Sequence, residues 1–249
     1  MAQAILIAEK GTREVTRDLL EAVPTPARSG RWHPVPFSTV LKTAEESLTR
    51  AGYEVENMRL ALGSRNQRFF ATMTLQCPLA AGAMLAVGLR SSHDQSLAMG
   101  WAIGSRVLVC SNLAFSSQKV IARKHTTFGA TRFAEAICRC VKELADYREH
   151  EAFRIRQMQA WELTDEQAES VLLRAYEQGI LGPRALPVAL DEWRKPTFAD
   201  FEGHTAWSLY NAITFALRHR VESNPQAFAH ATVRLGPLLL PGAAPARAN

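Results

Sequence analysis

The chain has 249 residues, of which 47% are hydrophobic and 21% are charged, and its formal net charge is +5. This apolar content excludes an intrinsically disordered protein and is enough to build a sizeable core. No apolar run approaches the roughly 20 residues of a membrane-spanning helix, and no basic residue precedes the short apolar stretch at the start, as a secretory signal would require. We therefore expect a cytoplasmic protein with no membrane partner.

The cysteines do not suggest a disulfide framework or a metal centre. Four cysteines in a chain of this length are too few to staple a fold. Cys138 and Cys140 stand two residues apart in a predicted helix, so their side chains point in different directions and cannot clamp one ion. We expect neither a metal nor another cofactor.

Positive charge is concentrated in one region. Between Met58 and Phe133 there are nine Lys and Arg residues and one acidic residue, Asp94, which leaves a net charge of −3 for the rest of the chain. Such an asymmetry favours a polyanionic partner, although arginines scattered over a solvated surface would give the same count.

The first elements are an extended segment and a helix. Prolines at 24, 26, 34 and 36 exclude a helix there, so residues 1–35 are predicted to be an extended lead-in. From about Ser38 the apolar residues recur three and four apart until Gly52, which predicts a helix with one buried face.

The period then changes to two, which predicts strands. In the stretch 67–76, Phe69 and Met73 fall on a core face, while Phe70 falls on the opposite, polar face with Arg68, Thr72, Thr74 and Gln76. The turn residues Gly63 to Asn66 predict a hairpin before this strand. Further strands are expected near 84–90, 97–103 and 106–110. One face of the strand at 97–103 carries only Gly and Ala, which permits close approach of a helix, a backbone or a ligand.

Helices follow the strands. A long helix is predicted over about 131–161, a second one opens at a capping box of Thr164 and Gln167, and a last one runs over about 205–221. The order predicts an α+β fold: an antiparallel sheet of four or five strands flanked by helices, with a helical C-terminal lobe. The expected parts are the lead-in (1–35), a sheet domain with the long helix (36–162), the helical lobe (163–235) and a flexible tail (236–249).

A basic loop between the strands and the long helix is the first candidate site. Lysine, arginine, histidine and threonine side chains in residues 119–127 are those that bind phosphate oxygens, and nearby phenylalanines could stack on bases. The candidate nucleic-acid-binding residues are Arg65, Arg68, Phe70, Arg90, Arg106, Lys119, Arg123, Lys124, His125 and Phe128. We expect a non-catalytic protein that binds nucleic acid, with a preference for single-stranded DNA, and that can form homo-oligomers.

Two alternatives stay open. His93, Asp94 and His125 could form an acid–base site in an enzyme acting on a nucleotide or a nucleic acid. The basic region could also bind a protein, as an inhibitor of a host defence or nuclease system would.

Four motifs in order resemble a known family. They are the Ser-His-Asp loop at 92–96, the strand at 106–113 with Asn112, the basic stretch at 123–126 and the helix at 205–214. Together they resemble the phage- and plasmid-like proteins grouped as domain of unknown function 932, with Ser111 and Leu113 as departures. The family-motif residues are His93, Asp94, Asn112, Trp207, Tyr210 and Asn211. The resemblance implies a role in a phage, plasmid or integrated element, and the predicted order of elements is similar to the core of single-strand annealing recombinases.

Overall fold

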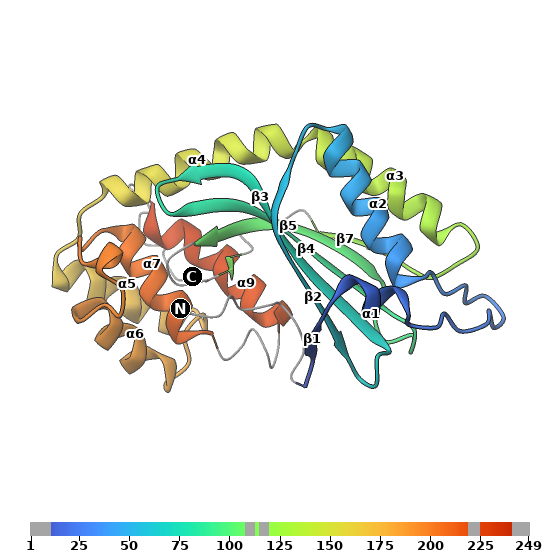
Figure 1. The fold of residues 1–249 in the computed structure, drawn as a ribbon. Coiled ribbons are helices and arrows are strands. Elements are labelled where there is room, and N and C mark those ends of the chain that lie inside the picture. The colour runs from blue at the N-terminus through green and yellow to red at the C-terminus, as the bar shows by residue number, and fades with distance from the viewer. Residues whose placement is uncertain (1–10, 108–112, 115–119, 219–224, 241–249) are drawn as a thin grey trace, which may run out of the picture.

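An antiparallel sheet with helices on one face and a helical lobe at one end makes up the fold, here described from a computed structural model (Figure 1). The structure describes residues 11–107, 113–114, 120–218 and 225–240. The predicted α+β class, with an antiparallel sheet and a helical C-terminal part, is therefore confirmed.

Seven strands form the sheet within the described residues: β1 (Arg13–Val15), β2 (Val55–Gly63), β3 (Arg68–Ala80), β4 (Ala83–Ser92), β5 (Met99–Val107), β6 (Leu113–Ala114) and β7 (Val120–Arg123). The strands β1 to β5 pair in sequence order, and both β6 and β7 pair with β5. The prediction of four or five strands was too low because β1, β6 and β7 are too short to show a two-residue period.

The predicted hairpin joins β2 and β3. Ser64, Arg65 and Asn66 all adopt positive φ angles, and Gly63 pairs with Arg68 across the turn. This local turn chemistry sets the register in which Phe69 and Met73 face the core.

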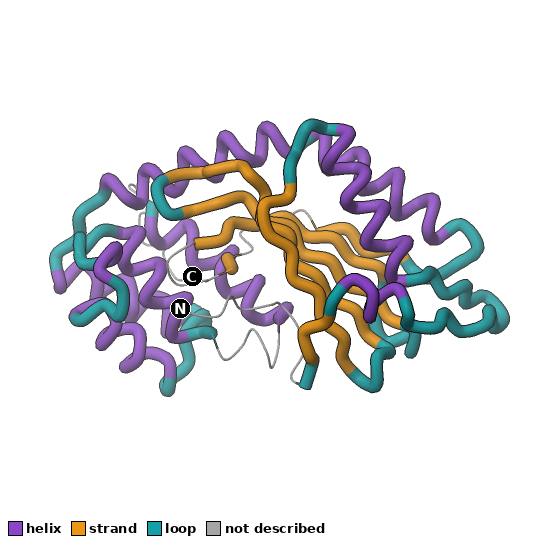
Figure 2. Tube along the Cα trace, viewed as in Figure 1, coloured by secondary structure: helices purple, strands orange, loops and turns teal. Residues whose placement is uncertain are grey.

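Two helices cover one face of the sheet (Figure 2). They are α2 (Phe37–Arg50) and α3 (Gly129–Lys142), and their apolar stripes join those of β3 and β5 in one core. The next helix, α4 (Leu144–Ala160), crosses β3 and leads to the lobe. The single long helix predicted here is instead two helices, which are divided at Glu143.

The helical lobe consists of α5 (Asp165–Glu177), α6 (Ala185–Arg194), α7 (Ala206–Ala216) and α9 (Pro225–Leu235), with short 3₁₀ turns at Ala199–Phe201 and Gly236–Leu239. The predicted capping box of Thr164 and Gln167 opens α5. A second box, formed by Thr205 and Ser208, opens α7.

The predicted lead-in and tail both contain regular structure. Residues 1–35 include β1 and a short helix, α1 (Arg17–Glu21). At the other end, Leu238 and Leu239 are buried in the core, so residues 236–240 are not a loose tail; 241–249 lie outside the described residues.

The second face of the sheet is less polar than its sequence indicates. Phe70 is only 4% exposed, and Thr72 and Thr74 are buried as well, so the prediction of Phe70 as an exposed stacking platform was wrong. A side chain of the sheet itself covers part of this face. The side chain of Arg90 lies across Gly100, where a Cβ atom would come within 2.8 Å of its Cγ. Gly100 on the Gly/Ala face therefore leaves room for the side chain of Arg90.

Among the residues that the structure describes, no helix has both the length and the apolar character that a membrane span needs.

Candidate nucleic-acid interface

The segment between α1 and α2 forms a projecting turn, which we call the finger (residues 27–33). Ser29 and Trp32 exchange backbone hydrogen bonds of 3.0 and 2.9 Å, and Gly30 supplies the positive φ that the tight turn requires. Arg28 and Arg31 are exposed on it. Figure 1 shows this segment projecting at the end of the molecule where α3 begins.

The second segment is the loop from β7 to α3. Arg123 ends β7, and the loop then contains Lys124, His125 and Thr127, followed by Phe128 at the N-cap of α3. Lys124 is exposed, Arg123 is partly buried, and Phe128 is 63% exposed. The exposed phenyl ring provides a face on which a base can stack, and the cations of the loop lie close to it in the sequence.

Two hydrogen bonds hold the finger against this loop. The backbone N–H of His33 donates to the carbonyl of His125 at 3.0 Å. The Nε2 atom of His33 lies 3.1 Å from the hydroxyl of Thr127. Segments far apart in sequence thus form one surface, to which Arg132 in the first turn of α3 adds another exposed cation.

We call this surface the basic end: Arg28, Arg31, Arg123, Lys124, Arg132 and Phe128. Neither contributing stretch contains an acidic residue, because the sequence has no Asp or Glu between Glu21 and Glu45 or between Asp94 and Glu135. Sequence reasoning identified the loop but missed Arg28, Arg31 and Arg132. The signal that could have found the finger is an acid-free, proline-flanked run with a Ser-Gly-Arg turn in its middle.

The arginines of the sheet contribute less than predicted. Arg68 forms an ion pair with Asp94 at 2.8 Å, and Arg59 forms two hydrogen bonds with Glu14, at 2.9 and 2.7 Å. Arg90 is partly buried over Gly100, and Arg65 is exposed in the hairpin turn beyond the sheet. A carboxylate that already neutralises an arginine competes with phosphate, so Arg68 is a weaker candidate than the exposed cations of the basic end.

Some predicted residues cannot be placed. Lys119 and Asn112 lie outside the described residues, and Arg106 belongs to β5 without a described side chain.

His93 and His125 are buried side chains, with 4% and 6% exposure. His93 stacks on Phe37 with 3.8 Å between ring centroids, and its Nε2 lies 3.0 Å from the carbonyl oxygen of Val35. His125 Nε2 lies 3.3 Å from the Ser91 hydroxyl. Burial, with a smaller contribution from the neighbouring His93, lowers the pKa of His125 to about 4. Burial also lowers the pKa of His93, against the opposing effects of the Val35 carbonyl and Asp94.

Asp94 is engaged elsewhere. Burial alone would raise the pKa of its carboxyl, but hydrogen bonds from Ser96 and Arg68 outweigh burial and bring the pKa to about 2. The two histidines are close to each other, but both are buried and the carboxylate is bound to Arg68 and Ser96. This arrangement favours a structural role for His93, Asp94 and His125 over the acid–base role considered from sequence.

A buried polar junction, which was not predicted from the sequence, joins the sheet to the helical lobe. Glu151 on α4 is 5% exposed, and it accepts hydrogen bonds of 2.8 and 2.6 Å from Arg154 and one of 3.3 Å from Ser105 on β5. The guanidinium of Arg154 lies over the ring of Tyr210 on α7, 5.4 Å from its centroid. Burial alone would lower the pKa of Arg154, but the Glu151 carboxylate outweighs burial and raises it, so the guanidinium stays charged.

The remaining family-motif residues pack around this junction. The rings of Trp207 and Tyr210 stack at 5.4 Å, and the side-chain amide of Asn211 donates to the carbonyl of Trp207 at 2.9 Å. All three residues are buried. Burial raises the pKa of Tyr210 to about 12 against the opposing effect of the Arg154 guanidinium, and no hydrogen bond of good geometry reaches its hydroxyl from the described residues. The motif on α7 therefore maintains the scaffold.

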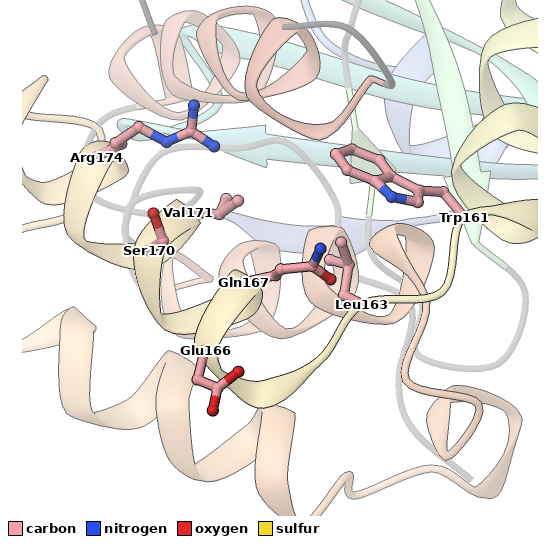
Figure 3. Close-up of a pocket in the computed structure, with 7 residues that line it drawn as sticks. All are labelled: Trp161, Leu163, Glu166, Gln167, Ser170, Val171 and Arg174. Carbon is pink, nitrogen blue, oxygen red and sulfur yellow. The ribbon is translucent and has the colours of Figure 1, made fainter. Parts of the chain in front are cut away.

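Two cavities, of about 250 and 240 Å³, lie in the helical part. The first is an open groove along α5, with Trp161 and Arg174 at opposite ends and Leu163 and Val171 between them (Figure 3). The second lies between the β3–β4 turn and the start of α7, with Trp207 in its lining. Neither is lined by a residue of the basic end or by His93, Asp94 or His125.

No group of three or more His, Cys, Asp or Glu side chains in the described part of the chain is arranged to hold a metal ion.

Comparison with known proteins places the chain in a family without assigning an activity. No curated protein and no solved structure gives a match. One family model, described as a domain of unknown function (DUF932), matches residues 25–236, a stretch that includes the finger, the whole sheet from β2 onward and the helical lobe. The chain therefore belongs to the DUF932 family.

Proposed function

We propose that this protein binds nucleic acid at the basic end, with a preference for single strands and without a catalytic step. The observation that carries the proposal is the docking of the finger on the β7–α3 loop through His33 and His125. That contact brings together cations from two stretches of chain that contain no carboxylate.

The chemistry of the surface fits a phosphate backbone. Arg28, Arg31 and Lys124 are exposed, and their stretches of chain supply no acidic side chain to neutralise them. Arginine and lysine side chains gain affinity for nucleic acid by releasing condensed counterions, which makes binding steeply dependent on salt.

The preference for single strands rests on Phe128. Its ring is 63% exposed at the start of α3, next to the cationic loop. A duplex keeps its bases stacked on each other, whereas a single strand can place a base on an aromatic ring at a gain of about 1–3 kcal/mol per base.

The test is fluorescence anisotropy of a labelled single-stranded oligonucleotide at several salt concentrations, with an unlabelled duplex of the same sequence as competitor. We expect salt-sensitive binding for which the duplex competes poorly. A triple variant, Arg31→Ala, Lys124→Ala and Arg132→Ala, should weaken binding roughly tenfold or more and reduce the slope of log affinity against log salt by roughly 2.

A control triple removes the same charge elsewhere: Arg148→Ala, Arg156→Ala and Lys195→Ala, all exposed residues of α4 or of the end of α6. It should bind nearly as the parent does. Equal losses in both triples would assign the effect to net charge and reject the basic end as the site. Absence of binding by the parent at low salt would reject the nucleic-acid proposal.

A further inference from the structure

His93 and His125 lie behind the basic end and hold its two halves together. His93 accepts the ring of Phe37 as a stacking partner and bonds to the carbonyl of Val35, so it fixes the chain just after the finger. The backbone carbonyl of His125 accepts a hydrogen bond from the backbone N–H of His33 at 3.0 Å, and this bond fixes the finger itself. We call these two residues the histidine clasp.

The clasp is built for neutral rings. A carbonyl oxygen can only accept a hydrogen bond, so the Nε2 of His93 carries the proton and Nδ1 is a bare acceptor. The Nδ1 atoms of both His93 and His125 are buried and have no hydrogen-bond partner among the described residues. A proton added to either Nδ1 would create a buried charged N–H with no acceptor, beside a second histidine.

The surrounding charges only partly compensate. Asp94 favours the charged form of His93, but its carboxylate is already bound to Arg68 and Ser96. The other side chains in contact with the two rings, Ser91 on β4 and Phe37 on α2, are uncharged. The finger contributes the ionisable ring of His33, and the loop contributes exposed Lys124.

We infer that protonation of the histidine clasp releases the finger from the β7–α3 loop, so that mild acid separates the two halves of the basic end. The idea that this release regulates a nucleic-acid site rests on the proposed function. Release of the finger itself can be measured without any ligand. Released, both histidines regain an ordinary affinity for protons, and docking is therefore progressively lost as the pH falls below about 6.5.

Amide hydrogen exchange of the protein without ligand tests this directly. The reporter is the His33 amide, which donates to His125, and the reference is the Gln76 amide, which donates to Glu54 at the start of the β2–β3 pair. After correction for intrinsic exchange, protection at His33 should fall about tenfold between pH 7.5 and pH 5.5 through His125 alone, and further with His93. Protection at Gln76 should stay unchanged.

Equal loss at the two amides would show acid unfolding of the sheet domain and overturn the inference, as would constant protection at His33. Because this comparison uses the parent protein, it does not depend on whether a variant folds. His125→Asn and His93→Gln should each flatten the pH response of the His33 amide. His150→Asn, at an exposed histidine of α4, should leave that response as in the parent.

A nucleic-acid arm keeps the two proposals apart. At pH 7.5 a saturating single-stranded oligonucleotide should raise protection at His33, because ligand held by both halves stabilises the docked finger. Lack of that rise together with lack of binding counts against the proposed function, while the pH response of the free protein still decides the present inference.

Discussion

The basic end and the buried junction both depend on arginine, and they differ in what surrounds it. At the junction, Arg154 pairs with Glu151 and lies over Tyr210 of α7, while Ser105 of β5 donates to Glu151. The charge of Arg154 therefore helps to hold the sheet to the lobe. At the basic end, Arg28, Arg31 and Lys124 are exposed on stretches without carboxylates. Buried, paired charge indicates structure, and exposed charge without nearby acids indicates a surface available to a ligand.

The largest effect is expected for Arg154→Ala at the junction. The substitution removes the guanidinium that donates two hydrogen bonds to the buried Glu151 carboxylate, which we expect to cost about 3–5 kcal/mol of the free energy of unfolding. Denaturant unfolding followed by circular dichroism measures this loss. A companion variant, Glu151→Gln with Arg154→Met, removes both charges and should recover part of the stability; a loss as large as for Arg154→Ala would contradict the role of the pair.

Phe128→Ala tests whether base stacking contributes to binding at the basic end. If the ring stacks on a base, its loss should weaken single-strand binding by about 1–3 kcal/mol and duplex binding much less. Anisotropy titrations with both oligonucleotides measure the difference. Phe153→Ala, which removes a phenyl ring of similar exposure (60%) from α4, is the matched control and should leave both affinities unchanged. Identical behaviour of the two variants would refute stacking on Phe128.

Tyr210→Phe tests the junction more gently. The hydroxyl is buried without a partner among the described residues, whereas the ring stacks on Trp207 and lies under Arg154. Deletion of the hydroxyl alone should therefore change the free energy of unfolding by less than about 1 kcal/mol. Tyr210→Ala, which also removes the ring, should cost several times more, and a large loss in the phenylalanine variant would reveal a hydrogen bond at this hydroxyl.

The smallest effect is expected for the stability of the basic-end triple, Arg31→Ala, Lys124→Ala and Arg132→Ala. These exposed side chains form no ion pair within the described part of the chain, and exposed charges contribute little to folding, so the free energy of unfolding of the variant should lie within about 0.5 kcal/mol of the parent value. Thermal and denaturant unfolding beside the parent check this. A clear destabilisation would mean that these side chains belong to the scaffold, and it would remove the contrast between the two regions.

Local signals in the sequence predicted local structure well. Turn residues between β2 and β3 and the capping box at Thr164 require only neighbours within a few positions, and both are found where expected. The alternation in β3 also identified its core face, including Phe69 and Met73.

Burial that depends on distant neighbours was not predictable in the same way. Phe70 has the alternation of an exposed residue, but the second face of the sheet is packed closely enough to bury it. Glu151 and Arg154 look like an ordinary surface pair at helical spacing, and only the approach of β5 and α7 buries them. The basic end likewise depends on a contact between His33 and His125, which no window along the sequence contains.

The contacts of His93 and His125 with residues 33–37 limit how far the chain can be shortened from its N-terminus. A chain shortened to start at Ser38 would lose the finger, the Val35 carbonyl and Phe37, the stacking partner of His93, and would expose the imidazole of His93 to water. Such a truncation would therefore yield a damaged protein, even though a boundary at that point looks natural from the prolines. A shortened chain should instead begin ahead of Arg13, because β1 pairs with β2 and because Val15 and Leu20 are buried in the common core.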